Sequence, residues 1–92
     1  MTATELQGKI IQFIKVEHNG YAVNIEKSSK RGVPDILACI KGKFIAIEVK
    51  VGNDTLSGVQ KYNLDKIDGA GGIAIVANSL EDVKSILKLI ME

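Results

Sequence analysis

Residues 32–51 read GVPDILACIKGKFIAIEVKV and contain two apolar, strand-like runs. Between the runs lies the dipeptide Lys41-Gly42, and its glycine can adopt the positive φ that a tight hairpin loop requires. With a two-residue loop there, counting outward along both strands places Asp35 directly opposite Glu48. The stretch therefore predicts a β-hairpin with one acid near the open end of each strand.

The two acids are expected to be close neighbours on one face of this hairpin. Residues that face each other across two strands have Cβ atoms about 4.5–5.5 Å apart. Two carboxylates at that distance repel unless a proton or a cation lies between them. Because side chains alternate faces along a strand, Lys50 shares the face of Glu48. Two interpretations stay open from the residues alone: a structural pair of acids neutralised by Lys50, or a site for a hard cation such as Mg²⁺, which binds carboxylate and carbonyl oxygens.

Length and composition limit the class of protein. The chain has 92 residues, the size of one small domain, and we expect a single domain over residues 1–92. Apolar residues make up 46% of it and charged residues 25%, which is typical of a soluble globular protein and excludes a disordered tail. The apolar runs are far shorter than the roughly 18–20 residues that cross a bilayer. Without a secretory signal pattern, a cytoplasmic location and no membrane partner are expected.

The chain has one cysteine and one histidine, which narrows the possible chemistry. A single cysteine excludes an intramolecular disulfide and a cysteine-based zinc site. Cys39 stands in the middle of an apolar strand, and we expect it to be a small buried residue. With His18 as the one histidine, a Ser-His-Asp or Cys-His mechanism has little support.

Helical and strand patterns alternate before the hairpin and continue into it. Thr2 is a candidate cap of a first helix, with Glu5 completing a capping box, and Asn19-Gly20 ends that helix. Alternation over residues 21–26 predicts a strand. The hairpin is apolar on both faces over most of its length, which indicates a central hairpin covered on both sides.

A second set of elements follows the hairpin. Ser57 and Gln60 form another capping box, which begins a helix that ends near Asp68-Gly69. An apolar strand over residues 73–77 leads to a last helix that Ser79 caps. The predicted order is αβββαβα, an α/β fold with one mixed sheet flanked by helices.

A basic loop precedes the first acid of the hairpin. Lys27, Lys30 and Arg31 stand shortly before Asp35. A domain that binds nucleic acid usually carries a clear excess of positive charge. The net charge of +1 is too small to indicate such binding by itself. A local basic loop beside an acidic pair can still hold phosphates. A solvated loop without such a role stays open as the alternative.

Three short motifs resemble those of the PD-(D/E)XK nucleases, and more narrowly the VRR-NUC branch of that superfamily. They are RGVPD at residues 31–35, IEVK at residues 47–50 and LSGVQK at residues 56–61. The resemblance covers nearly the whole chain, with a helix before the hairpin and a helix and a strand after it. It implies a restriction-endonuclease-like fold in a minimal, stand-alone domain.

The resemblance implies catalytic and metal-binding roles at matching positions of the hairpin. Asp35 and Glu48 would bind Mg²⁺ or Mn²⁺, and the backbone carbonyl of Val49 would be a further ligand. Lys50 would position or activate the hydrolytic water. This set needs neither histidine nor cysteine.

Residues outside the hairpin also receive roles from the resemblance. Glu5 matches a first-helix acid that some members use at the site, so it is a candidate metal ligand as well as a helix cap. Gln60 matches the family's catalytic-site glutamine, which contacts the phosphate or metal-bound water, and this role is compatible with capping. Nucleic-acid contacts to phosphate are expected from four basic residues: Lys27, Lys30, Arg31 and Lys61.

The function predicted from the resemblance is a divalent-metal-dependent DNA endonuclease that hydrolyses phosphodiester bonds. It would be selective for branched DNA such as Holliday junctions or flaps and would act as a homodimer. One alternative is a nuclease-fold module without catalysis, which binds DNA or a protein partner through the same face. A third interpretation is a plain α/β interaction domain whose acids pair with Lys50 and Lys30.

Overall fold

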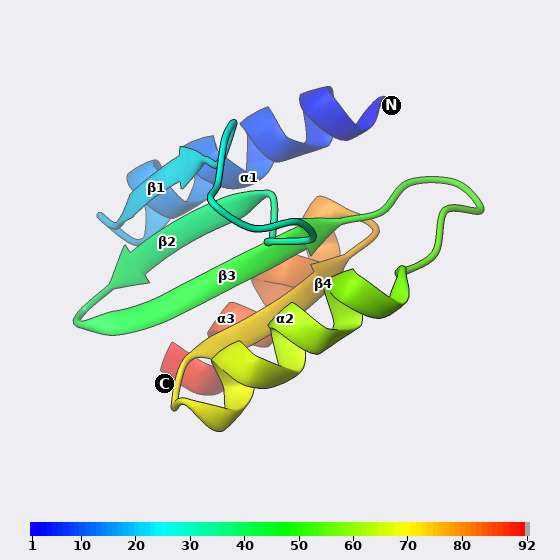
Figure 1. Cartoon of the computed structure of the whole chain (residues 1–92). Helices are drawn as coiled ribbons and strands as arrows, with labels where there is room; N and C mark the ends of the chain where they lie inside the picture. Colours follow the sequence, from blue (N-terminus) through cyan, green and yellow to red (C-terminus); the bar gives the residue numbers. More distant parts are fainter. Residues whose placement is uncertain (92) are drawn as a thin grey trace.

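The computed structural model describes residues 1–91 and confirms the predicted αβββαβα order (Figure 1). A four-stranded mixed sheet lies between helices. The elements are α1 (Ala3–Glu17), β1 (Tyr21–Asn24), β2 (Ile36–Ile40), β3 (Lys43–Val49), α2 (Gly58–Gly69), β4 (Ile73–Ala77) and α3 (Leu80–Met91). Within residues 1–91, no helix is both long and apolar enough to span a membrane.

The sheet has the strand order β1-β2-β3-β4, with two antiparallel pairs followed by one parallel pair. The predicted two-residue hairpin loop is confirmed, because Ile40 pairs with Lys43 across β2 and β3. Lys41 and Gly42 both have positive φ, 49° and 81°, which is what a tight loop between right-twisted strands requires. The hairpin register is therefore set at this end of the molecule.

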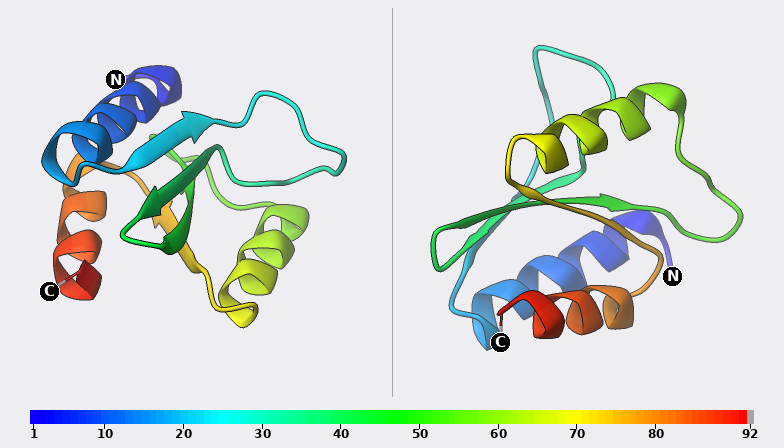
Figure 2. Two further views of the ribbon diagram at one scale, coloured as in Figure 1. Left: turned by 90° about the vertical axis from the view of Figure 1, so that its left-hand side faces the viewer. Right: turned by 90° about the horizontal axis from the view of Figure 1, so that it is seen from below.

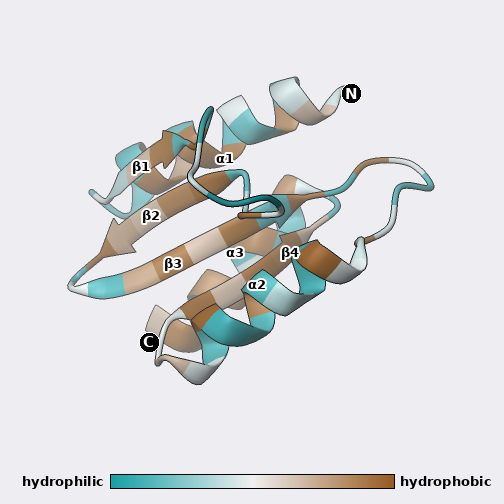
Figure 3. Ribbon diagram, in the orientation of Figure 1, coloured by the Kyte–Doolittle hydropathy of each residue, from teal (hydrophilic) through white to brown (hydrophobic). Residues whose placement is uncertain are grey.

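Helices cover the two faces of the sheet unequally. α1 and α3 lie side by side on one face and α2 lies on the other (Figure 2). The main core fills the space between the sheet and the α1 and α3 pair, and the strands that border it are apolar (Figure 3). Its fully buried side chains include Leu6, Ile10 and Ile14 of α1, Ile45 and Ile47 of β3, and Val83 and Leu87 of α3. Each large side chain of this kind contributes roughly 1.5–3 kcal/mol of stability through burial.

The prediction that the hairpin is covered on both faces holds fully for one face and only in part for the other, where Ala46 and Glu48 are buried but the end near the hairpin loop is not. On the second face, α2 packs over β4. The part of this face that β1, β2 and the start of β3 form is not covered by α2. Tyr21, Cys39 and Phe44 lie there in one cross-strand row, and Tyr21 and Phe44 are 63% and 46% exposed. Cys39, predicted to be buried, is exposed for the same reason. Local apolar pattern could not reveal this, because it carries no information on where α2 packs.

Both predicted capping boxes are present. Glu5 N–H donates to Thr2 Oγ1 at 3.1 Å and Thr2 N–H donates back to Glu5 Oε1 at 2.9 Å. Ser57 and Gln60 make the same reciprocal pair at the start of α2. Each pair satisfies N–H groups that a helix start leaves without intrahelical partners. The second box fixes the side chain of Gln60 beside the end of β3, where the acids lie.

Candidate active site

Asp35 stands directly before β2 and is tied to the end of β3. Its Oδ2 accepts a hydrogen bond from the backbone N–H of Val49 at 2.8 Å. Its own carbonyl accepts from the N–H of Ile25 at 2.8 Å, which joins the segment after β1 to the same point. The preceding Pro34 is buried, and its ring fixes its own φ, which limits the paths the backbone can take into Asp35. Asp35 is thus held against β3, next to Glu48.

Glu48 is a buried acid whose side chain is only partly satisfied. It is 3% exposed, and its Oε2 accepts a hydrogen bond from Gln60 Nε2 at 3.1 Å. Among the described residues, its Oε1 has no hydrogen-bond partner. Desolvation by burial, and secondly the nearby charge of Asp35, raise the pKa of Glu48 to about 7, while Lys50 acts in the opposite direction. A buried carboxylate with a free oxygen is costly unless a proton or a cation occupies that position.

Lys50 lies between two acids and is itself 7% exposed. Its Nζ is 3.6 Å from Glu48 Oε2 and 3.5 Å from Asp54 Oδ2. Its backbone is fixed to the end of β4, because its N–H donates to the Ala77 carbonyl at 2.9 Å and its carbonyl accepts from Asn78 Nδ2 at 3.0 Å. Asp54 was not predicted as part of this cluster, although its spacing of four residues from Lys50 was visible in the sequence.

The side-chain amide of Gln60 makes both of the contacts that the sequence suggested for it, the helix cap and a contact at the acidic cluster. Its Oε1 accepts from the N–H of Ser57 at 2.9 Å, which completes the helix cap. Its Nε2 donates to Glu48. The capping box therefore orients the amide so that its donor end points at the buried acid.

The donor set at this cluster fits a hard cation. Asp35 and Glu48 supply carboxylate oxygens, and one oxygen of Glu48 has no other partner in the described part of the chain. Residues 1–91 contain no group of three or more His, Cys, Asp or Glu side chains that could hold a metal. A cation bound by the pair would therefore take its other oxygens from a backbone carbonyl, water and phosphate, as Mg²⁺ commonly does.

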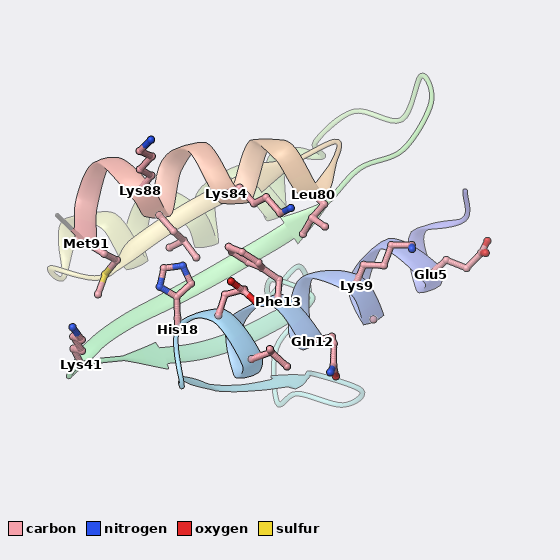
Figure 4. Close-up of a pocket in the computed structure, with 14 residues that line it drawn as sticks. Glu5, Lys9, Gln12, Phe13, His18, Lys41, Leu80, Lys84, Lys88 and Met91 are labelled. Atoms are coloured by element: carbon pink, nitrogen blue, oxygen red, sulfur yellow. The ribbon is translucent and has the colours of Figure 1, made fainter.

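Glu5 takes its capping role and stands apart from the other acids. Its side chain is bonded to Thr2, and that backbone hydrogen bond lowers the pKa of Glu5. Figure 4 shows Glu5 at one end of a hollow between α1 and α3, pointing outward. Its part in metal binding stays a prediction.

The basic loop lies exposed near the acids and is anchored to α2. Asn63 was not predicted as a functional residue, yet it is buried and its Nδ2 donates to the carbonyls of Arg31 and Val59, at 3.0 and 2.9 Å. Lys61 forms an ion pair with Asp65 at 3.3 Å, and both side chains are largely exposed, so the pair contributes little stability. The exposed basic residues of this region are Lys27, Lys30, Arg31 and Lys61.

Comparison with known proteins gives one family and a consistent fold. The family model described as archaeal Holliday junction resolvase (Hjc) matches residues 9–78. A solved structure titled VRR_NUC domain has a TM-score of 0.71 at 20% identity and covers 89% of this chain and 94% of its own. Another, titled VRR_NUC domain protein, has a TM-score of 0.75 at 20% identity and covers 97% and 87%.

A third similar structure is Hjc from Archaeoglobus fulgidus, described as a Holliday junction resolvase from an archaeal hyperthermophile. Its TM-score is 0.64 at 23% identity, and the match covers 83% of this chain and 67% of that one. No curated protein matches the sequence. At these identities the solved structures establish the fold.

Proposed function

The chain belongs to the archaeal Holliday junction resolvase (Hjc) family, and from this premise we propose that it is a Mg²⁺- or Mn²⁺-dependent endonuclease that cuts branched DNA. The resemblance to VRR-NUC nucleases of the PD-(D/E)XK superfamily is confirmed by the family match and the shared fold. Selectivity for junctions or flaps and dependence on metal are the parts of the proposal that need experiment.

One observation carries the proposal: a buried acid with a free oxygen lies beside a second acid and a buried lysine. Glu48 and Asp35 lie close enough that the charge of Asp35 raises the pKa of Glu48, although like charges repel. Lys50 neutralises only part of this charge, because it is shared with Asp54. Such an arrangement costs stability in the metal-free protein and favours a bound cation.

In the proposed mechanism each residue of the cluster has one task. Asp35, Glu48 and the Val49 carbonyl would hold the cation, and Gln60 keeps the Glu48 carboxylate in place through its amide. A bound Mg²⁺ or Mn²⁺ supplies Lewis-acid stabilisation of charge on the phosphate. The ammonium of Lys50 donates a hydrogen bond to the attacking water or to a phosphate oxygen. The water oxygen forms a bond to phosphorus while the bond from phosphorus to the 3′ oxygen breaks. One proton of the water is released to solvent and the 3′ oxygen takes up one proton, which gives a 5′-phosphate and a 3′-hydroxyl.

The basic residues are proposed to contact the DNA backbone. Lys27, Lys30 and Arg31 belong to the exposed loop before Asp35, and Lys61 extends from the first turns of α2. All four are exposed, so they can reach phosphates without a change in the core. Phosphate contacts fix the position of the DNA and do not read its sequence.

The direct test is cleavage of defined DNA structures by the purified protein. Labelled four-way junctions, flaps and linear duplexes are incubated with Mn²⁺, with Mg²⁺ and with EDTA. We expect cleavage of a branched substrate only with a divalent metal, and its loss in Asp35→Ala. The proposal fails if no DNA is cut, or if cutting is the same in Asp35→Ala.

A nuclease-fold binding module without catalysis is the second candidate. It predicts DNA binding that weakens with salt and shows no need for divalent metal. All the signature residues are present in the chain, so the sequence contains no sign of lost catalysis. The EDTA arm of the cleavage test, together with binding measured on the same junction, separates the two.

We also propose that the active form is a homodimer. A domain of this size hides only about 60–65% of the surface of its unfolded chain, and association would add to its core. Several large apolar side chains remain exposed, among them Val16 at 62% and Leu89 at 79%. Light scattering on the eluted protein distinguishes a species near 9.9 kDa from one of twice that mass. A monomer at the concentrations that cleave DNA would contradict this proposal.

A further inference from the structure

A hollow on the α2 side of the sheet is lined by residues from several separate elements, two of which bring lysine side chains to it. Lys30 comes from the basic loop and Lys66 from α2. Lys43 borders the hollow at the start of β3, but its side chain leaves the opposite face of the strand from that of Phe44. The hollow has a volume of about 720 Å³, and no acidic residue of the described chain lines it. The two lysine charges of Lys30 and Lys66, with no compensating acid in the lining, favour an anionic ligand.

An aromatic ring forms part of the same hollow. Phe44 is 46% exposed, and a single exposed apolar residue needs no explanation by itself. Here, however, the ring is held in position from one side. A Cβ at residue 72 would lie 2.8 Å from Phe44 Cδ2, so Gly72 is what allows the ring to pack against the start of β4. The hollow therefore offers a fixed π-face among lysines.

The position of Lys30 follows from the buried anchor of the basic loop. Asn63, which also lines the hollow, holds the carbonyl of Arg31. Gly32 adopts a φ of 74° and packs so closely on Val59 that any side chain would collide there. The loop and α2 lie on the same side of the sheet (Figure 2). These contacts hold the basic loop beside α2, which carries Lys66.

The hollow and the acidic cluster share one face of one strand. Phe44 and Glu48 are four residues apart on β3, so their side chains point to the same face. At about 3.3 Å per residue they are roughly 13 Å apart along the strand. Consecutive bases on one DNA strand rise about 3.4 Å, so this distance corresponds to about four nucleotides. A strand held at the acids can therefore extend to the hollow.

We propose that this hollow binds an unstacked nucleotide of the branched DNA substrate, with its base on Phe44 and the neighbouring phosphates on Lys30 and Lys66. The inference rests on the proposed function and adds a reason for selectivity. Stacking on an aromatic side chain needs a base that has left the helix, and a branch point supplies such bases at lower cost than continuous duplex. Duplex DNA offers only its phosphates to the same surface.

Binding measured in EDTA tests the hollow without cleavage. The probes are a fluorescein-labelled four-way junction, a linear duplex of the same sequence, and the same junction with 2-aminopurine at its centre. Phe44→Leu keeps an apolar side chain and removes the ring. We expect it to weaken junction binding by roughly tenfold, to leave duplex binding unchanged, and to abolish the quenching of 2-aminopurine that stacking causes.

A paired lysine variant gives a second, independent readout. Lys30→Gln with Lys66→Gln should reduce the slope of log affinity against log salt by about 1.4–1.8, which corresponds to two phosphates lost. The matched control is Lys15→Gln with Lys88→Gln, because these exposed lysines lie on the helices of the opposite face, and it should leave the slope unchanged. Equal losses in both pairs, or equal weakening of junction and duplex by Phe44→Leu, would overturn the proposal.

Failure of this inference is distinguishable from failure of the proposed function. Suppose that the wild-type protein cuts junctions with Mn²⁺ while Phe44→Leu binds them as tightly as wild type. The proposed nucleotide site in the hollow is then wrong, and the proposed nuclease function is kept. If the wild-type protein cuts no DNA, the nuclease is wrong. In that case a selective loss of junction binding in Phe44→Leu still establishes the hollow as a nucleotide site.

Discussion

Gln60 donates a hydrogen bond to Glu48 at 3.1 Å while the other end of its amide caps α2 through Ser57 at 2.9 Å. The start of a helix and a buried acid on a strand are thereby joined through one side chain. Because the cap fixes the amide, Glu48 keeps its orientation even though one of its oxygens has no partner in the described structure. This arrangement allows the cap and the acid to be tested separately.

Gln60→Glu is expected to preserve the cap and disturb the acid. Glutamate also completes a capping box, so α2 should begin at the same residue. The new carboxylate, however, replaces a donor next to Glu48 with a like charge. We expect the free energy of unfolding at pH 8 to fall by roughly 1–3 kcal/mol, and by less at pH 5, where Glu48 carries a proton. Urea denaturation at both pH values measures this, with Gln12→Glu on the exposed face of α1 as a control that changes little.

The raised pKa of Glu48 predicts that the metal-free protein loses stability as the pH rises from about 4.5 to about 7. The pKa is about 7 in the folded protein against 4.5 as the ordinary value. The contribution of this group is therefore fully present below pH 4.5 and is lost as pH rises through 7. Glu48→Gln removes the titration and nearly preserves the shape. It should be more stable than wild type at pH 8 by roughly 1–3 kcal/mol, and similar to it at pH 5.

The control for this comparison is a variant that loses an exposed charge in place of a buried one. Glu81→Gln removes an exposed acid that pairs only loosely with Lys84, at 3.8 Å. Its stability should follow that of wild type across the pH range. A parallel fall in wild type and Glu48→Gln between pH 5 and 8 would show that Glu48 does not cause the slope.

Metal binding should depend on both acids and on pH. Titration calorimetry with Mn²⁺ is expected to give a binding isotherm for wild type and none for Asp35→Asn or Glu48→Gln. Affinity should increase between pH 6 and 8, because a metal competes with the proton on Glu48. Glu5→Gln decides the open role of Glu5: unchanged affinity assigns it to the cap alone, and a tenfold or greater loss makes it a ligand. Full Mn²⁺ affinity in Asp35→Asn would contradict the proposed site.

The elements that local chemistry specifies were predictable from sequence. Gly42 and the alternation of β2 and β3 were enough for the register that brings Asp35 toward Glu48. Helix starts followed from Thr2 and Ser57, because a capping box is formed within four residues. These features need no knowledge of distant contacts.

Features that depend on packing between distant elements were missed. Cys39 is exposed because α2 lies over β4, and no pattern within β2 reports that. In the sequence Asn63 has the pattern of an ordinary polar helix residue. Its contact with the Arg31 carbonyl, 32 residues away in sequence, exists only once the loop has folded against α2. The raised pKa of Glu48 arises from burial by several elements, which composition does not contain.

Lys50→Met is expected to remove catalysis and to keep metal binding. Methionine fills a similar volume but cannot donate to water or phosphate. A loss of one such donor typically lowers the rate about 10²–10³-fold. Single-turnover cleavage of a junction in Mn²⁺ measures this loss, and calorimetry checks that Mn²⁺ still binds. Asp54→Asn, which touches only the exposed partner of Lys50, should change the rate by a few fold at most. A rate in Lys50→Met near that of wild type would remove Lys50 from the mechanism.

The Asn63 anchor should control the basic loop more than the core. Asn63→Leu keeps the size of the side chain but removes the donor to the carbonyls of Arg31 and Val59. Leaving the Arg31 carbonyl without its partner should cost about 1–3 kcal/mol of stability where it stays buried, and less if the loop moves into solvent. Hydrogen exchange separates the two results: amides of residues 27–33 should exchange faster while those of β3 stay protected. The affinity for the junction should fall as well, because the basic residues of a loosened loop are no longer held in position to bind phosphates at the same time. Faster exchange throughout β3 would instead show that Asn63 stabilises the sheet, and that the loop has no anchor of its own.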